Sequence, residues 1–153
     1  MKKEQLVRHE FEPVYDKNSE ILILGSFPSV KSREQGFYYG HPQNRFWKVL
    51  AAIVQEKIPD SIEEKKEMLL RNHIAVYDVI WQCKITGSSD SSIKDVVPAD
   101  ITTIVELSKI RKIYANGKLA EKLFSKSYYF SGRSATARLR RQRGIPGSSF
   151  RSV

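Results

Sequence analysis

The sequence predicts an α/β fold, a three-layer sandwich in which helices flank a central, mainly parallel four-stranded sheet. Short apolar segments alternate along the chain with segments of helical periodicity, the order typical of parallel sheets. Residues 21–24 are Ile-Leu-Ile-Leu and precede a glycine. Apolar residues here do not alternate with polar ones, a pattern typical of strands that are buried on both faces of a sheet. The sequence shows neither an internal repeat nor a linker, so we expect a single domain over residues 1–130.

The individual elements follow from local patterns. Strands are expected at residues 20–25, 73–80, 112–115 and 127–130. Helices are expected from residue 44, at residues 61–72 and 98–109, and after the turn at residues 116–117. Asn44 is a good N-cap for a helix whose apolar face begins with Phe46 and Trp47. Ser61 and Glu64 form a capping-box pattern at the start of the second helix.

Loops at the carboxyl ends of the predicted parallel strands are the expected location of a ligand site. Residues 26–42, after the first strand, form a long loop rich in serine, glycine, proline and aromatic residues. Loops of this length are uncommon in compact domains and are often functional. Further loops follow Ala115 and Phe130. We therefore expect the functional residues at this edge of the sheet.

The net charge of +9 gives only weak support for a nucleic-acid partner, because of its distribution. From Lys126 onward the chain holds seven basic residues and no acidic residue, whereas residues 1–125 carry a net charge of only +2. The charge is therefore concentrated in a short C-terminal segment.

The composition argues against several classes of protein. No run of about 18 apolar residues is present, so no membrane span is expected. The first residues include lysines with no apolar segment behind them, so no secretory signal is expected. The single cysteine, Cys83, cannot form an internal disulfide and has no cysteine or histidine at metal-ligand spacing. We expect a cytoplasmic monomer that uses no metal and no cofactor.

Two segments of the first loop carry the most information about function. Residues 25–29 are Gly-Ser-Phe-Pro-Ser, and residues 38–47 are Tyr-Tyr-Gly-His-Pro-Gln-Asn-Arg-Phe-Trp. They resemble the first signature of the uracil-DNA glycosylase superfamily, whose mismatch-specific branch has Gly-x-Asn-Pro-Gly and His-Pro-x-Asn-Arg-Phe-Trp. They are more similar still to the hypoxanthine-DNA (deoxyinosine) glycosylase group, with Gly-Ser-x-Pro and Tyr-Tyr-Gly-His-Pro-x-Asn-x-Phe-Trp. Further pieces of that group's pattern lie at residues 76–81, 87–93 and 113–117.

The resemblance implies a DNA-repair glycosylase that flips a deaminated base out of double-stranded DNA and hydrolyses its N-glycosidic bond. Phe27 stands where the mismatch-specific uracil branch has a water-activating asparagine, so the resemblance favours hypoxanthine over uracil, and uracil and xanthine stay further candidate substrates. The important asparagine of the hypoxanthine group matches Asn44, which we take as the catalytic residue that holds water or base. The first motif has no lysine placed as a Schiff-base nucleophile, so strand cleavage is not expected.

Other residues of these segments are assigned to base and DNA binding. Backbone N–H groups of residues 25–29 can donate to a base oxygen, and donors aimed at developing negative charge are commonly the largest catalytic contribution. The base pocket is expected to contain Gly25, Ser26, Phe27, Pro28, Ser29, Tyr39, Gly40, His41 and Asn116. DNA contacts are expected from Lys31, Ser32, Arg45, Ser131 and Arg133.

Purely structural interpretations of the same residues stay open. Asn44 can serve only as an N-cap, and His41 only as a hydrogen-bonding loop residue. The aromatic residues of segment 38–47 can belong to the core. Asp78 can merely brace the end of a strand, and the asparagine of the turn at residues 116–117 is common in turns.

The C-terminal segment, residues 131–153, departs from the group's pattern. A second signature, Leu-Pro-Ser-Thr-Ser-Pro-Ala-Asn, followed by Tyr-Ser and a closing helix, is expected after the last strand and is not found. Codons can be chosen for residues 136–148 that, shifted by two bases, encode Arg-Ser-Thr-Ser-Pro-Ala-Thr-Arg-Tyr-Ser-Trp-Lys. We therefore predict an atypical basic tail that is frameshifted or disordered. The alternative is a tail selected for phosphate binding.

Two other functions are alternatives to an active glycosylase. A catalytically impaired DNA-binding homologue that lacks the second signature loop fits the same residues. A nucleotide-handling α/β protein is disfavoured, because the sequence has no glycine-rich phosphate loop.

Overall fold

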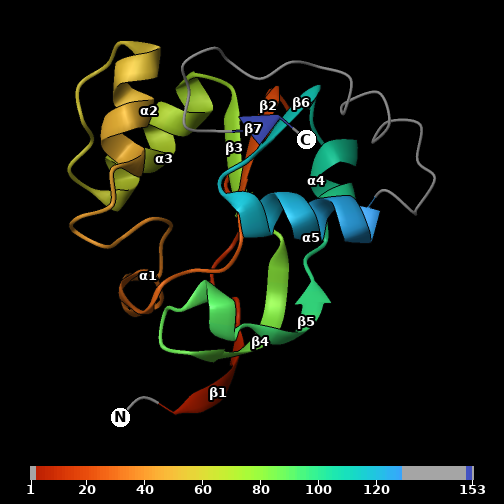
Figure 1. The fold of residues 1–153 in the computed structure, drawn as a ribbon. Helices are drawn as coiled ribbons and strands as arrows, with labels where there is room; N and C mark the ends of the chain where they lie inside the picture. Colours follow the sequence, from red (N-terminus) through yellow and green to blue (C-terminus); the bar gives the residue numbers. More distant parts are fainter. Residues whose placement is uncertain (1–2, 129–150, 153) are drawn as a thin grey trace.

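A parallel sheet forms the centre of the computed structural model, which describes residues 3–128 and 151–152 (Figure 1). Its strand order is β3-β2-β6-β7. The three parallel strands are β2 (Ile21–Gly25), β3 (Ile74–Asp78) and β6 (Lys112–Ala115). The two-residue strand β7 (Arg151–Ser152) pairs antiparallel with β6. Three of the four predicted strands are therefore present.

The prediction of a mainly parallel four-stranded sheet is wrong in its fourth strand. Residues 127 and 128, predicted to begin that strand, belong to helix α5 (Lys118–Tyr128). Residues 129 and 130 lie outside the described part of the chain. Nothing in the sequence of α5 ends the helix before residue 127, because the segment contains neither glycine nor proline.

A second, antiparallel sheet was not predicted. It consists of β1 (Glu4–Arg8), β4 (Ile80–Thr86) and β5 (Lys94–Pro98), in the order β1-β4-β5. Only Val79 separates β3 from β4, so one extended segment passes from the parallel sheet into the antiparallel sheet. The 3₁₀ helix η1 (Asp90–Ser92) lies between β4 and β5. Pairing of β1 with β4 holds the N-terminal segment next to the end of β3.

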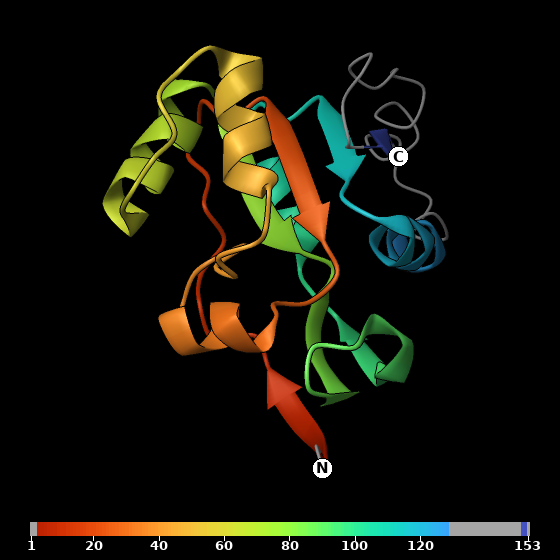
Figure 2. The same ribbon diagram turned by 60° about the vertical axis from the view of Figure 1, so that its left-hand side comes forward.

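Helices lie on both faces of the parallel sheet (Figures 1 and 2). Helices α2 (Phe46–Val54) and α3 (Ile62–Arg71) lie on one face, and α4 (Ile101–Glu106) and α5 lie on the other. Right-handed crossovers explain this, because the connections from β2 to β3 and from β3 to β6 run in opposite directions across the sheet. The short helix α1 (Val30–Gln35) lies within the long loop after β2. Among the described helices, none has the length and apolar character needed to cross a bilayer.

A capping box explains where α3 begins, whereas the N-cap residue of α2 makes no side-chain hydrogen bond to its helix. The Ser61 side chain accepts from the Glu64 N–H, and the Glu64 carboxylate accepts from the Ser61 N–H, which confirms the predicted capping box. Helix α2 begins later than predicted: its N-cap is Arg45, and Asn44 precedes the cap.

The carboxyl ends of the three parallel strands meet at one edge. Gly25 pairs with Asp78, and Leu24 pairs with Ala115. Asn116 follows β6 directly, and its N–H donates to the Leu24 carbonyl at 2.7 Å. Residues far apart in the sequence are therefore neighbours at the position where the ligand site is expected.

Candidate active site

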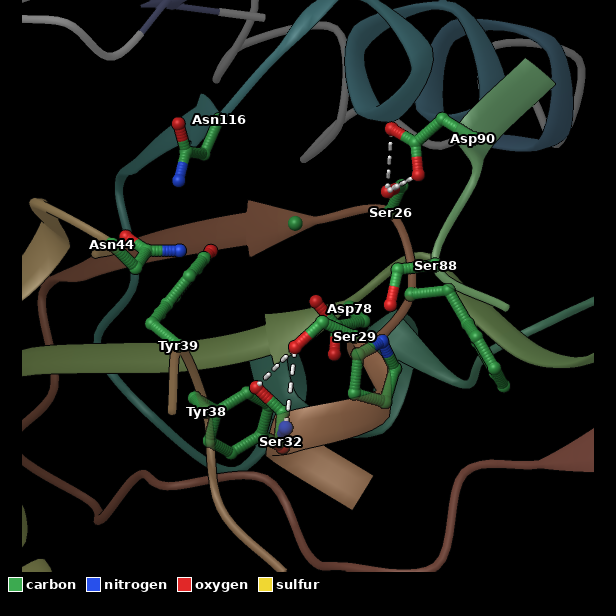
Figure 3. Close-up of a pocket in the computed structure, with 13 residues that line it drawn as sticks. Ser26, Ser29, Ser32, Tyr38, Tyr39, Asn44, Asp78, Ser88, Asp90 and Asn116 are labelled. Atoms are coloured by element: carbon green, nitrogen blue, oxygen red, sulfur yellow. Dashed lines mark hydrogen bonds between the residues drawn. The ribbon is translucent and has the colours of Figure 1, made fainter. Parts of the chain in front are cut away.

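A cavity of about 180 Å³ lies at this edge of the sheet (Figure 3). Eight residues predicted for catalysis or base binding line it: Gly25, Ser26, Phe27, Pro28, Ser29, Tyr39, Asn44 and Asn116. Five other residues complete the lining: Ser32, Tyr38, Asp78, Ser88 and Asp90. Pockets for drug-sized ligands measure about 300–1,000 Å³, so this volume favours a ligand about as large as a single base.

Gly40 and His41, predicted for the base pocket, do not line the cavity. His41 is exposed, and its Nδ1 accepts a hydrogen bond from the Gln43 N–H at 3.1 Å. The backbone of Tyr39 has a φ of 52°, in the left-handed region. This turn brings Tyr39 to the cavity and leads the next two residues away from it.

The predicted DNA contacts differ in exposure. Lys31 and Arg45 are exposed, as contact with phosphates requires. Ser32 is only 1% exposed, and its hydroxyl accepts a hydrogen bond from the Gly40 N–H at 2.9 Å. Ser32 therefore faces the cavity and not the surface, which corrects its assignment to DNA. Ser131 and Arg133 lie outside the described residues, as does most of the predicted tail.

The side chain of Asn44 is oriented by the start of α2. Its Oδ1 accepts a hydrogen bond from the Phe46 N–H at 2.9 Å. Because an N–H group can bond only the oxygen of the amide, the nitrogen Nδ2 turns toward the cavity (Figure 3). From the position before the N-cap, Asn44 therefore holds the N–H of the first residue of α2 and also presents N–H donors to a ligand.

Tyr39 places a hydroxyl without a partner in the cavity wall. Its ring stacks on Phe46, with the ring centroids 3.8 Å apart. Among the described residues, none forms a hydrogen bond with this buried hydroxyl, toward which the side chains of Asn44 and Asn116 point (Figure 3). Burial, together with the charge of Asp78, raises the pKa of Tyr39 well above its usual value. The hydroxyl therefore stays protonated and can donate to a ligand.

A buried pair of His9 and Asp78 adjoins the cavity. His9 Nε2 lies 2.7 Å from Asp78 Oδ2, and His9 Nδ1 lies 3.0 Å from the Phe11 carbonyl oxygen. Because a carbonyl oxygen only accepts, Nδ1 carries a proton, and the contact between Nε2 and Oδ2 holds one more. The pair is then neutral overall, whether that second proton is on His9 or on Asp78. Neutrality avoids the cost of a buried net charge, since the two side chains are 0% and 5% exposed.

Arg33 holds the turn after β2 in place. Its guanidinium donates to the carbonyls of Pro28 and Gly87, both at 3.1 Å, and lies 5.8 Å from the centroid of the Phe27 ring. Among the described residues, no hydrogen-bond acceptor meets the N–H groups of Phe27 and Ser29. These two groups are available as the main-chain donors that the sequence predicted, whereas Pro28 has no N–H.

The lining of the cavity contains no lysine or arginine, and its two acidic side chains are Asp90 and the Asp78 that pairs with His9. The Ser26 hydroxyl lies 3.4 Å from both carboxylate oxygens of Asp90. Burial raises the pKa of Asp90, and the hydrogen bond from Ser26 partly offsets this. A neutral ligand such as a base suits these surroundings better than a phosphate does.

The described residues include neither a cluster suited to a metal ion nor a reactive thiol. Within it, no group of three or more histidine, cysteine, aspartate or glutamate side chains is arranged to hold a metal ion. Cys83 is fully buried, and burial raises the pKa of its thiol to about 11. The thiol therefore stays protonated and packs as a small apolar side chain.

Comparison with known proteins identifies the family. The family model described as the uracil DNA glycosylase superfamily matches residues 12–149. The chain belongs to the uracil-DNA glycosylase superfamily. Membership confirms the resemblance seen in the sequence and makes the chain a monofunctional DNA glycosylase, a class of DNA-repair enzyme. The match extends past residue 130, so it includes most of the predicted tail.

Relatives within the superfamily are similar over most of their length. A Methanosarcina acetivorans protein named hypoxanthine DNA glycosylase is 38% identical over 117 residues, 75% of this chain and 74% of the relative. A Methanosarcina barkeri protein of the same name is 37% identical over 110 residues, 71% of this chain and 70% of the relative. The NMR structure of a candidate uracil-DNA glycosylase from M. acetivorans matches with a TM-score of 0.72 and 35% identity, covering 84% of this chain and 80% of the other.

Sequence reasoning missed part of this superfamily site. Asp78, Ser88 and Asp90 fall within segments 76–81 and 87–93, which already carried the resemblance, so a signal for them existed. His9 had no such signal, because its position depends on the unpredicted pairing of β1 with β4.

Proposed function

We propose that this superfamily member excises deaminated bases, hypoxanthine foremost, from double-stranded DNA by hydrolysing the N-glycosidic bond of a flipped nucleotide. One observation carries the proposal: Asn44 is fixed with its amide nitrogen toward a base-sized cavity at the end of β2. Two relatives named hypoxanthine DNA glycosylase give further support. A cytoplasmic location and a monomeric state belong to the same proposal.

The chemistry assigns Asn44 to the base and not to water. In deoxyinosine the C1′–N9 bond breaks, its electron pair leaves with the base, and the oxygen of water bonds C1′ while a proton of that water passes to the base. Removing one donor aimed at such developing negative charge commonly slows a reaction about 10²- to 10³-fold. An N–H group that donated to the attacking water would instead reduce its nucleophilicity. The Asn44 amide and the N–H groups of Phe27 and Ser29 are therefore assigned to the departing base.

Phe27 supports the preference for hypoxanthine over uracil. Its side chain is 9% exposed and lines the cavity, where an aromatic face can stack on a flipped base. Phenylalanine cannot orient water, so hydrolysis at this site depends on stabilising the base as it leaves.

Release of base from defined DNA tests the proposal. We expect a duplex with a single deoxyinosine to be cut at that position only after alkali treatment, because a monofunctional enzyme leaves an intact strand with an abasic site. Duplexes with deoxyuridine or deoxyxanthosine at the same position rank the three bases. Asn44→Ala protein, purified in the same way, controls for contaminating glycosylases. Enzyme in excess that releases none of the three bases would contradict the proposal.

A second candidate function is a catalytically impaired DNA-binding homologue, which the missing second signature in residues 131–153 favours. Such a protein binds a deoxyinosine duplex without releasing base. Its binding weakens steeply with salt, because each lysine or arginine that meets a phosphate releases counterions. Binding and base release measured on the same duplex separate the two functions.

The proposed frameshift makes a prediction about the gene. We expect one insertion or deletion near the codons for residues 131–136 to restore Ser-Thr-Ser-Pro-Ala followed by Tyr-Ser. Resequencing the gene is the measurement, and we expect the restored protein to release hypoxanthine faster than the present chain. If no single insertion or deletion restores the motif, residues 131–153 are the native C-terminal segment and the prediction is wrong.

A further inference from the structure

We infer that Asp78, held by His9, and the Tyr39 hydroxyl together select bases that carry a ring N–H next to a carbonyl. Hypoxanthine, xanthine and uracil have this lactam edge, whereas adenine and cytosine have a ring nitrogen acceptor next to an amino group. The inference rests on the proposed function and specifies how the same cavity distinguishes hypoxanthine from adenine and uracil from cytosine; guanine shares the lactam edge with xanthine and is not distinguished from it by these two groups.

The first observation is the free oxygen of Asp78. Its Oδ2 is occupied by His9 at 2.7 Å, whereas within the described structure Oδ1 accepts no hydrogen bond. Oδ1 lies 2.5 Å from the position that a Cβ on Gly25 would take, and Asp78 lines the cavity. A fixed acceptor is therefore directed at a ligand beside Gly25.

The second observation is the donor on the same side of Gly25. The Tyr39 hydroxyl oxygen lies 2.9 Å from the same Cβ position, is buried, and has no partner among the described residues. One acceptor and one donor flanking one glycine complement a ring N–H and its neighbouring carbonyl oxygen. Against adenine, the Asp78 oxygen would face the lone pair of N1 and be left unpaired, and the Tyr39 hydroxyl would have to turn from donating to accepting a hydrogen bond from the amino group. Sites built to bond a ligand group reject analogues without that group by up to about 10⁴- to 10⁵-fold.

The third observation is the role of His9 as a positioning residue. Its Nδ1 is tied to the Phe11 carbonyl, so its ring is fixed and Nε2 holds one oxygen of Asp78 in place. An isolated carboxylate at this position would repel a base that leaves with negative charge. The neutral His9–Asp78 pair supplies the acceptor without that repulsion.

The experiment compares release of hypoxanthine with release of purine from deoxynebularine, which lacks both N1–H and the carbonyl. Asp78→Leu removes the acceptor at similar volume, and we expect the ratio of the hypoxanthine rate to the purine rate to fall at least about tenfold, or about 1.4 kcal/mol. Asp78→Asn is the matched control. In this variant no carboxylate faces His9, so His9 Nε2 carries no proton and accepts a hydrogen bond from the new amide nitrogen. The amide oxygen then takes the place of Oδ1 as the acceptor for the base. We therefore expect Asp78→Asn to keep the ratio.

Tyr39→Phe tests the donor in a variant that should fold, because it removes a buried hydroxyl without a partner and keeps the ring stacked on Phe46. We expect the same fall in the ratio at an unchanged melting temperature. Ratios that stay unchanged in both Asp78→Leu and Tyr39→Phe, or an Asp78→Asn ratio as low as that of Asp78→Leu, would overturn this inference alone. A wild-type enzyme that releases neither base would overturn the proposed function, and this inference with it.

Discussion

Asn44→Asp is expected to lower the rate of base release by about 10²- to 10³-fold while the protein stays as stable as the wild type. An aspartate oxygen can still accept the hydrogen bond that Phe46 N–H now gives to Oδ1 at 2.9 Å, so this contact at the start of α2 is kept. The second carboxylate oxygen replaces the N–H donor that faces the cavity. A negative charge then meets the base as it gains negative charge. Single-turnover rates on a deoxyinosine duplex and the thermal unfolding midpoint measure the two effects.

Asn44→Ala separates the two roles of this side chain. It removes the donor and the hydrogen bond to the Phe46 N–H together, so we expect a comparable loss of rate and a loss of about 1 kcal/mol in the free energy of unfolding. An Asn44→Asp enzyme with the wild-type rate would show that Asn44 only stabilises the start of α2, a purely structural role of the kind left open by the sequence.

The parallel half of the fold could be predicted because its signals are local. Residues 21–24 are uniformly apolar, and in the structure Leu22 and Leu24 are fully buried. The antiparallel sheet gave no such signal, because four of the five residues of β1 and four of the five residues of β5 are exposed. Its pairing is set by tertiary contacts between residues such as Arg8 and Gln82, which lie far apart in the sequence.

The candidate site divides in the same way. The residues of segments 25–29 and 38–47 were found because they are contiguous and form specific motifs. The His9–Asp78 pair joins residues 69 positions apart, and a lone histidine or aspartate has no pattern that marks it. His41 shows the opposite error, because a position inside the motif does not ensure a position in the cavity. The extent of the domain, residues 1–130, and the nature of the tail stay predictions.

Gly25→Ala is expected to lower base release by about 100-fold, because a displacement of about 1 Å at a reacting site can cost that much. A Cβ at this position would lie 2.5 Å from Asp78 Oδ1 and 2.9 Å from the Tyr39 hydroxyl oxygen, so both groups must move. Gly25 is not among the described glycines with positive φ, so the expected effect comes from steric displacement and not from backbone strain. Rates on the deoxyinosine duplex and the melting temperature are the measurements.

Gly40→Ala is the matched control for this substitution. A Cβ on Gly40 would come within 2.5 Å of Gln35 Oε1, the end of a flexible side chain outside the cavity lining, and 3.3 Å from the Ser32 Cα, which requires a shift of only a few tenths of an ångström. The side chain can rotate away, so we expect base release close to that of the wild type. Equal losses in the two variants would mean that any added methyl group in this region disturbs the enzyme. A Gly25→Ala enzyme as fast as the wild type would mean that base release does not depend on the present positions of Asp78 Oδ1 and the Tyr39 hydroxyl. The structure would then give no steric reason for a glycine at the end of β2.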